Sequence, residues 1–254
     1  MKKWVEKKLA KASKKILAKQ RPKIVAVTGS VGKTSTKDAI TAVLRQKFHV
    51  RGAVKNYNNE IGVPLTIIGM DSPGRSKLGW LRVLYRAWKL SHQKDKNYPA
   101  FLVLEMGADR KGDIAYLTDI APPDVAVVTA ISPAHTQFLG SIGEVAEEKG
   151  ELVRAMGKDG VAILNGDDLY VKDMEHEAPG RVIMYGFGDE QVRADDLSID
   201  FPEVGTRPRG MRGVLRLGQE QQGQFLIEAT IGRHTIYPAL AAAAVGFTLD
   251  LTIE

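Results

Sequence analysis

The sequence contains no cysteine. Disulfide bonds, zinc thiolate sites and cysteine nucleophiles are therefore excluded, and a cytoplasmic setting is the simplest expectation. No apolar run approaches the length of about 20 residues that a membrane span needs, and no apolar core follows the basic N-terminus, so we expect neither a spanning helix nor a secretory signal. With 44% hydrophobic and 26% charged residues over 254 positions, the composition is typical of a globular chain with a substantial core.

The basic residues are concentrated in two segments. Residues 1–23 carry nine Lys, one Arg and one Glu, while residues 74–98 carry four Lys, three Arg and one Asp. These segments have net charges of +9 and +6, so the remainder of a chain whose total is +6 carries −9. The high isoelectric point of 9.3 therefore does not indicate a basic surface spread over the fold.

Each basic segment has the spacing of an amphipathic helix. In residues 2–20, lysines surround an apolar stripe whose members recur every three to four residues, namely Val5, Leu9, Ala12 and Ile16. Residues 74–98 form an insertion with a second such stripe, namely Leu81, Leu84, Tyr85 and Trp88. Beside it lies a basic stripe of Arg82, Arg86 and Lys89.

Two interpretations of these helices are open. Either they pack on the body of the domain, with the tryptophans of the insertion in the core, or they lie on the inner, anionic face of a membrane with Trp80 and Trp88 inserted. A nucleic-acid partner is not expected, because no nucleic-acid motif accompanies the basic and aromatic residues. The sequence gives no indication of the oligomeric state.

From Lys23 onward the sequence alternates between strand and helix patterns, which predicts a doubly wound parallel sheet. The predicted strands are the apolar runs 24–27, 101–104, 125–128 and 161–164, and the predicted helices are 35–46, 142–156 and 237–248. Between Arg181 and Ile231, short β-type runs at 182–185, 214–217 and 225–231 are separated by Gly and Pro. They predict a small antiparallel sheet attached to the parallel one.

The most informative stretch joins the first predicted strand to the first helix of this sheet. It has the spacing G-x-x-G-K-T, two residues shorter than the common phosphate-binding loop, and consists of Gly29, Ser30, Val31, Gly32, Lys33, Thr34 and Ser35. Glycines let the backbone wrap around phosphate oxygens, and the following helix points its free N–H groups at them. Lys33 supplies a positive charge and Thr34 a hydroxyl for a magnesium ion. We therefore predict an α/β fold with a P-loop parallel sheet.

Polar residues also follow other predicted strands. Glu105 ends the apolar run 101–104, and His135 lies a few residues after the run 125–128, which are places where open α/β sheets bind ligands. The segment Asn56–Pro64 has three Asn in four positions and would be a polar turn if taken alone. The run Glu147–Glu151, taken alone, is a charged helix face.

As a set, these features resemble the Mur ligase family, the ATP-dependent amide-forming enzymes of peptidoglycan precursor synthesis. The resemblance covers roughly residues 23–250. It rests on five motifs, which are highly specific as a set. They are Thr28–Thr34, Asn56–Leu65, Leu104–Ala108, Ala134-His135 and Ala146–Glu151.

The resemblance implies roles for individual residues. Lys33 and the loop amides would hold the phosphates of ATP, and Thr34 and Glu105 would hold one Mg²⁺ ion. His135 would help to hold a second Mg²⁺ ion, toward which a carbamylated Lys149 would bridge. The Asn-rich segment would face the substrate through Asn56, Asn58 and Asn59, with Asn59 near the γ-phosphate and the metals, and His234 would contact the nucleotide base.

The resemblance also implies a reaction and a domain plan. A carboxylate of a UDP-muramyl peptide would be phosphorylated to an acyl phosphate, which an amino acid or D-alanyl-D-alanine would then attack. We expect a basic helix at 1–22 and the central ATP-binding domain at 23–254, without the family's uridine-nucleotide and C-terminal domains, and hence no ligase activity in this chain alone. A ligase of folate or a polyamide, and a membrane-associated ATP-binding module without ligase activity, are the alternatives.

The segment that contacts adenine departs from the family pattern. The family has Asn at two positions where this chain has Thr235 and Pro238. The identity of the base is therefore left open by the sequence.

Overall fold

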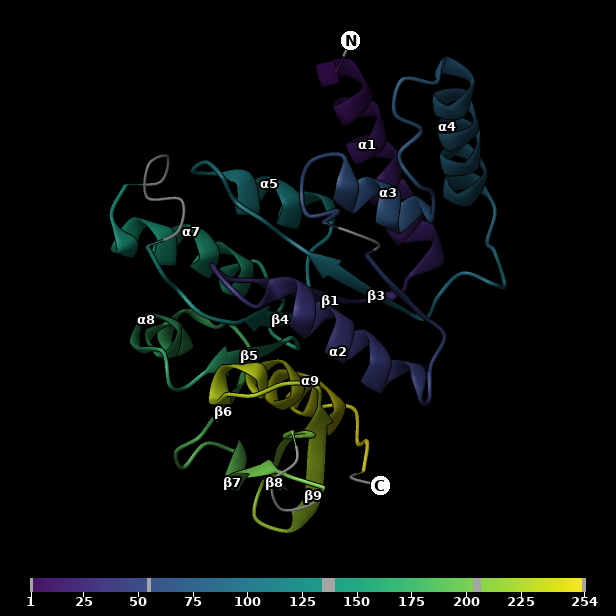
Figure 1. Cartoon of the computed structure of the whole chain (residues 1–254). Helices are drawn as coiled ribbons and strands as arrows, with labels where there is room; N and C mark the ends of the chain where they lie inside the picture. Colours follow the sequence, from purple (N-terminus) through teal and green to yellow (C-terminus); the bar gives the residue numbers. More distant parts are fainter. Residues whose placement is uncertain (1, 54–55, 134–139, 203–206, 253–254) are drawn as a thin grey trace.

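In the computed structural model, which describes residues 2–53, 56–133, 140–202 and 207–252, one nine-stranded sheet runs through the molecule (Figure 1). Its spatial order is β2-β3-β1-β4-β5-β6-β7-β8-β9. In chain order the strands are β1 Lys23–Thr28, β2 Val50–Gly52, β3 Phe101–Glu105, β4 Val125–Val128, β5 Val161–Asn165, β6 Arg181–Gly186, β7 Val192–Asp200, β8 Gly210–Leu217 and β9 Gln221–Glu228.

Helices cover both faces of this sheet. The α-helices are α1 Lys2–Gln20, α2 Lys33–Arg45, α3 Gly62–Ile68, α4 Lys77–His92, α5 Asp113–Ile120, α7 Ile142–Arg154, α8 Leu169–Asp173 and α9 Tyr237–Phe247. Two short 3-10 helices are η1 Met174–Glu177 and η2 Arg233–Thr235. Among the described residues, no helix is long and apolar enough to cross a membrane.

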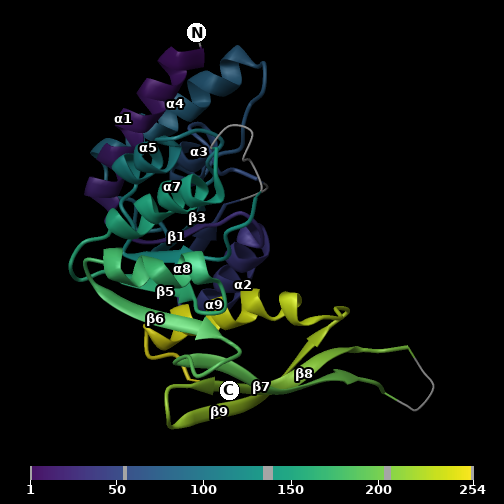
Figure 2. The same ribbon diagram turned by 90° about the vertical axis from the view of Figure 1, so that its left-hand side faces the viewer.

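The sheet is parallel from β2 through β7 and antiparallel from β7 through β9. The predicted combination of a parallel sheet and a small antiparallel part is therefore confirmed, with both parts in one continuous sheet (Figure 2). Assigning 182–185 to the antiparallel part was wrong, because these four residues lie in β6 and each pairs in parallel with a residue of β5. Strand β7 was missed because its sequence, VRADDLSID, is largely polar.

The sheet separates two hydrophobic cores. Along β1, Ile24 and Ala26 belong to the core beneath α1, α3, α4, α5 and α7, while Val25 and Val27 belong to the core beneath α2 and α9. Successive residues of a strand point to opposite faces, so a strand that is buried on both sides shows a continuous apolar run. This is why the central strands could be located from the sequence.

The inserted helix α4 contacts α1, and the two lie side by side at one end of the molecule (Figures 1 and 2). The packing face of α4 is formed by Val83, Ala87 and Leu90, all nearly inaccessible to solvent. Of the stripe noted in the sequence, Leu84 packs partly buried against the core, whereas Leu81, Tyr85 and Trp88 are exposed. The alternative that places both tryptophans of the insertion in the core is therefore wrong for Trp88, which is 53% exposed, while Trp80 packs partly buried against the core. Helix α4 has apolar residues on two faces. The buried face is the one that contains Ala87, because this small side chain lets α4 approach the neighbouring helices closely.

Helix α1 is anchored by buried side chains at helical spacing, which include Ser13 and Ile16. We predict that Ile16→Ala lowers the free energy of unfolding by about 2–5 kcal/mol, because it removes buried methyl groups from a closed core. Among the described residues, Ser13 Oγ has no hydrogen-bond partner. Ser13→Ala is the matched control on the same face and should be neutral or stabilising, because it removes an unsatisfied buried hydroxyl. Urea denaturation measures both, and an unchanged midpoint for Ile16→Ala would show that α1 is not docked.

Candidate active site

The phosphate loop connects the carboxyl end of β1 to the first turn of α2. Gly29 and Gly32 have φ angles of +144° and +81°, which other residues rarely adopt. A Cβ atom on Gly29 would lie 1.9 Å from Thr129 Oγ1, so this position excludes any side chain. Helix α2 begins at Lys33, two residues before its predicted start, and its first backbone N–H groups therefore face the loop.

The segment that follows β4 holds this loop in place. The backbone N–H of Ser30 donates to Ala130 O at 2.7 Å, and its hydroxyl accepts from the backbone N–H of Ser132 at 3.0 Å. Thr129 Oγ1 donates to Val31 O at 2.6 Å, and Thr129 O itself accepts from Asn165 Nδ2 at 2.8 Å. The segment after β4 thus fixes the loop and is itself bonded to the end of β5. The sequence did not indicate these contacts.

Glu105 is the last residue of β3, and its side chain is 1% exposed. One carboxylate oxygen accepts from Thr34 Oγ1 at 2.9 Å, and the other accepts from Asn58 Nδ2 at 3.1 Å. Residues from the phosphate loop helix, the Asn-rich segment and a strand end therefore meet at one carboxylate. The structure thus brings three of the predicted site residues, Thr34, Asn58 and Glu105, into contact.

The ammonium group of Lys33 is folded back over the loop, where it donates to Gly29 O at 2.8 Å and to Ser30 O at 3.1 Å. Burial lowers the pKa of Lys33, while the charges of Glu105 and Asp109 act in the opposite direction. A phosphate group entering the loop would offer this ammonium negatively charged oxygens in place of neutral carbonyl oxygens.

Lys149 projects from α7 and is 2% exposed. Burial lowers its pKa to about 8, and the positive charge of Lys33 adds to this shift, which Glu148 and Asp109 partly oppose. The adjacent Glu148 is engaged elsewhere, because its carboxylate accepts from the backbone N–H groups of Gly112 and Ile114 at the start of α5. Lys149 is therefore a buried amine that loses its proton unusually easily.

Two cavities border these groups. The larger, of about 370 Å³, is lined by Lys33, Asn58, Asn59, Glu60, Gly107, Ala108, Asp109, Asp113, Tyr116, Leu117 and Lys149. The other, of about 280 Å³, is lined by Gly32, Lys33, Thr34, Ser35, Asn56, Asn58 and Glu105. Because Lys33 and Asn58 line both cavities, the two are neighbours at the phosphate loop.

The remaining predicted site residues lie as follows. Asn59 lines the larger cavity. Its Oδ1 also accepts from the backbone N–H groups of Ile61 and Gly62, so the side chain binds the turn that leads into α3. His135 lies outside the described residues. His234 is exposed on η2, before α9.

An aromatic group that the sequence did not indicate lies close to η2 and α9. The Tyr237 ring packs edge-on against Phe187 at 4.8 Å, and its hydroxyl donates to Asp167 Oδ2 at 3.0 Å. The Arg233 guanidinium lies 4.4 Å from the centre of the Phe187 ring.

The residues present suit a magnesium ion that is shared with phosphate groups. Mg²⁺ prefers oxygen ligands, and it is commonly held by one or two carboxylates together with substrate phosphates. The Thr34 hydroxyl and the Glu105 carboxylate place two such oxygens 2.9 Å apart beside the loop. Within the described residues, no group of three or more His, Cys, Asp or Glu side chains could hold a metal ion without such help.

A glycine loop between strand and helix, a buried carboxylate on the adjacent strand and a buried lysine beside the loop define a P-loop α/β domain. Comparison with known families makes this specific. The sequence model of the Mur ligase middle domain matches residues 27–77 and 86–246, and the chain therefore belongs to the Mur ligase family.

The two sequence relatives described here have the same name. UDP-N-acetylmuramoyl-tripeptide–D-alanyl-D-alanine ligases of Mycobacterium leprae and Bacillus subtilis are 33% and 32% identical, over 97% of this chain in each case. The crystal structure of MurF ligase from Thermotoga maritima in complex with ADP has a TM-score of 0.77 at 26% identity, and it covers 98% of this chain and 50% of that one. The chain covers 44% and 46% of the two sequence relatives, so it spans about half their length.

The lowered pKa of Lys149 predicts how stability depends on pH. Its pKa is about 8 in the folded state against 10.5 for an ordinary lysine, so between these values the unfolded chain binds the extra proton. The contribution of Lys149 to the free energy of unfolding should therefore increase as the pH rises through this window.

Urea denaturation at a series of pH values measures this contribution. We predict a smaller increase in Lys149→Met than in the unsubstituted chain, and an unchanged profile for Lys158→Met, whose lysine is exposed. Identical profiles for Lys149→Met and the unsubstituted chain would mean that Lys149 keeps an ordinary pKa.

Proposed function

We propose that this chain is the ATP-binding part of a ligase that adds an amino acid or dipeptide, in particular D-alanyl-D-alanine, to a UDP-muramyl tripeptide. The observation that carries the proposal is the meeting of Thr34, Asn58 and Glu105 beside a phosphate loop in which Gly29 leaves no room for a side chain. The similarity to ligases named for this reaction supports the choice of substrates.

The proposed reaction has two steps. A carboxylate oxygen of the muramyl peptide attacks the γ-phosphorus of ATP, the bond to the β,γ-bridging oxygen breaks, and ADP leaves. The amine of the dipeptide then attacks the carbonyl carbon of the acyl phosphate, so that an amide forms while inorganic phosphate and a proton are released. Enzymes promote phosphoryl transfer mainly through positioning and charge neutralisation, which are the properties that this site has to provide.

Within this proposal, the side chains around the loop have separate roles. Lys33 and the loop N–H groups bind the β- and γ-phosphates, and Thr34 and Glu105 hold Mg²⁺ against them. Asn58 keeps the Glu105 carboxylate oriented, as its hydrogen bond at 3.1 Å already does. Asn56 and Asn59 face the substrate from the two cavities that they line.

Lys149 has the chemistry needed to become a carbamate. Its neutral amine would attack the carbon of CO₂, a nitrogen–carbon bond would form, and a proton would pass to water. The product is an anion, which suits a site for a second Mg²⁺ ion to which His135 would also contribute. Its pKa of about 8 means that an appreciable fraction of the amine is neutral near physiological pH, whereas an ordinary lysine is almost fully charged there.

Two other functions compete with this one. A folate or polyamide ligase has weaker support, because the two sequence relatives described above are both named for the muramyl-peptide reaction. The other is an ATP-binding module without ligase activity. The proposed setting is the cytoplasm, where UDP-linked precursors are made.

The first test concerns nucleotide binding. Lys33→Ala should weaken the binding of Mg-ATP by at least about tenfold, because it removes a side-chain cation that contacts the loop. Lys47→Ala is the control, since this exposed lysine follows the opposite end of α2. Isothermal titration calorimetry measures both, and equal affinities for Lys33→Ala and the unsubstituted chain would refute the loop assignment.

The second test concerns the reaction. The complete product of the reading frame that encodes these residues should release phosphate from ATP only when a UDP-muramyl tripeptide and D-alanyl-D-alanine are both present. Folate with glutamate serves as the competing substrate pair. Turnover with folate would favour the alternative ligase, and nucleotide binding without any turnover would favour the module.

A further inference from the structure

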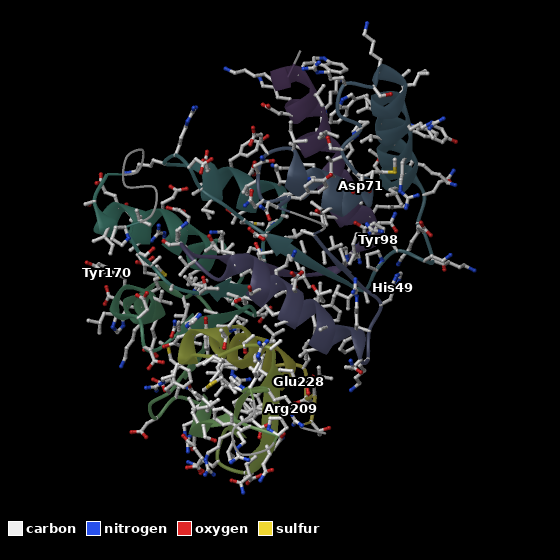
Figure 3. The ribbon with its side chains drawn as sticks, in the orientation of Figure 1. His49, Asp71, Tyr98, Tyr170, Arg209 and Glu228 are labelled. Atoms are coloured by element: carbon white, nitrogen blue, oxygen red, sulfur yellow. The ribbon has the colours of Figure 1, made fainter. Side chains whose placement is uncertain are left out.

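Helix α4 is held in a fixed orientation on the body of the domain. Gln20 Nε2 donates to Leu90 O and to Gln93 O at 2.6 and 2.7 Å, which ties the end of α1 to the end of α4. Arg86 Nε donates to Ile68 O at the end of α3. The buried Tyr98, which follows α4, donates its hydroxyl to Ile67 O at 2.6 Å (Figure 3). The face of α4 that points away from these anchors is therefore a defined surface.

This outer face is apolar and aromatic. Leu78, Leu81, Tyr85 and Trp88 recur every three to four residues, so they share one side of the helix, and each is more than half exposed. The rings of Tyr85 and Trp88 stack with their centroids 6.2 Å apart. We call these four residues the α4 outer face. Within the described residues, nothing covers them.

Positive charge surrounds the α4 outer face. Helix α4 contains two Lys and two Arg and no acidic residue, and Lys77, Arg82 and Lys89 are exposed on it. The neighbouring α1 adds an exposed Trp4, with Lys8 Nζ 5.6 Å from its ring centre, among further exposed lysines. The rest of the chain is acidic, because the net charge outside residues 1–23 and 74–98 is −9.

We propose that the α4 outer face docks on the surface of an anionic lipid bilayer. Tryptophan and tyrosine favour the level of the lipid headgroups, and long Lys and Arg side chains beside them keep their charges in contact with lipid phosphates. The acidic remainder of the molecule is repelled by the same surface, which orients the domain with α1 and α4 toward the lipid. A protein partner would have to match the same positive rim, whereas an anionic bilayer matches it without specific geometry.

The position of this surface separates it from the nucleotide site. The family match ends at residue 77 and resumes at residue 86, so Leu78, Leu81 and Tyr85 fall in the unmatched gap, and α1 precedes the match. Helices α1 and α4 also lie at the end of the molecule opposite β7–β9 (Figures 1 and 2). The proposal does not depend on the proposed ligase function, and its test needs no nucleotide.

The three tryptophans of the chain, Trp4, Trp80 and Trp88, all lie in α1 or α4, so intrinsic fluorescence reports on this end of the molecule. We mix the purified chain with vesicles of phosphatidylglycerol and phosphatidylcholine, and with vesicles of phosphatidylcholine alone. Binding should occur only to the anionic vesicles, should shift the emission to the blue, and should weaken as salt is added. Brominated lipid should quench the emission, because the rings would lie at headgroup depth.

The triple variant Leu81→Ser, Tyr85→Ser and Trp88→Ser should bind anionic vesicles at least about tenfold more weakly in co-sedimentation, because it removes most of the inserted apolar area. Its folding should be unaffected, since all three side chains are exposed, and circular dichroism checks this. The matched control replaces three exposed apolar residues elsewhere, namely Ile199, Phe201 and Ile231, with serine and should bind normally.

Three outcomes would overturn the proposal. The first is no binding of the unsubstituted chain to anionic vesicles at low salt, a result that does not depend on any variant. The second is equal binding by the triple variant and the control. The third is a concentration-dependent dimer in sedimentation velocity that the triple variant loses, without lipid binding, which would assign the α4 outer face to a second copy of the chain.

Discussion

The candidate site depends on the hydrogen bonds that the buried carboxylate of Glu105 accepts from Thr34 and Asn58. Glu105 stands at the end of β3, which is paired on both sides, and it is almost inaccessible to solvent, yet its carboxylate accepts these two hydrogen bonds. Burying an ionised carboxylate is costly unless polar partners surround it. These partners come from α2 and from the loop before α3. Because the buried carboxylate needs both hydrogen bonds, these two segments and the end of β3 must lie close together.

Hydrogen bonds between the phosphate loop and the segment after β4 make this arrangement rigid. The loop has no side chain of its own at Gly29, where Thr129 occupies the space. Its backbone is instead fixed through Ser30, which bonds to both Ala130 and Ser132. A loop that is ordered before phosphate arrives loses less conformational freedom on binding, which favours tight and well-oriented binding.

Much of the fold was predictable because it depends on local patterns. Strands β1, β3, β4 and β5 contain continuous apolar runs, and the phosphate loop has a spacing that few other structures require. The strand end at Glu105 followed from these two features. Strand β7 was not predictable, since its alternating polar residues and the bulge between Asp195 and Ser198 lack the apolar signal of a buried strand.

Other parts could not be predicted because they depend on tertiary contacts. The choice of the buried face of α4 is decided by the neighbouring α1, and the sequence alone favours the larger Leu, Tyr and Trp side chains. The use of Glu148 as a cap for α5 joins residues 34 and 36 positions apart in the chain. The low pKa of Lys149 likewise arises from burial and from Lys33, which no local pattern reveals.

We infer that the Glu105 carboxylate, with the Thr34 hydroxyl, forms a Mg²⁺ site that is completed by nucleotide phosphates. The most direct measurement is the affinity for ADP with and without Mg²⁺ in the unsubstituted chain and in Glu105→Gln, which keeps the shape of the side chain and removes its charge. We expect that Mg²⁺ strengthens ADP binding in the former and has little effect in the latter. An equal strengthening in both would contradict it.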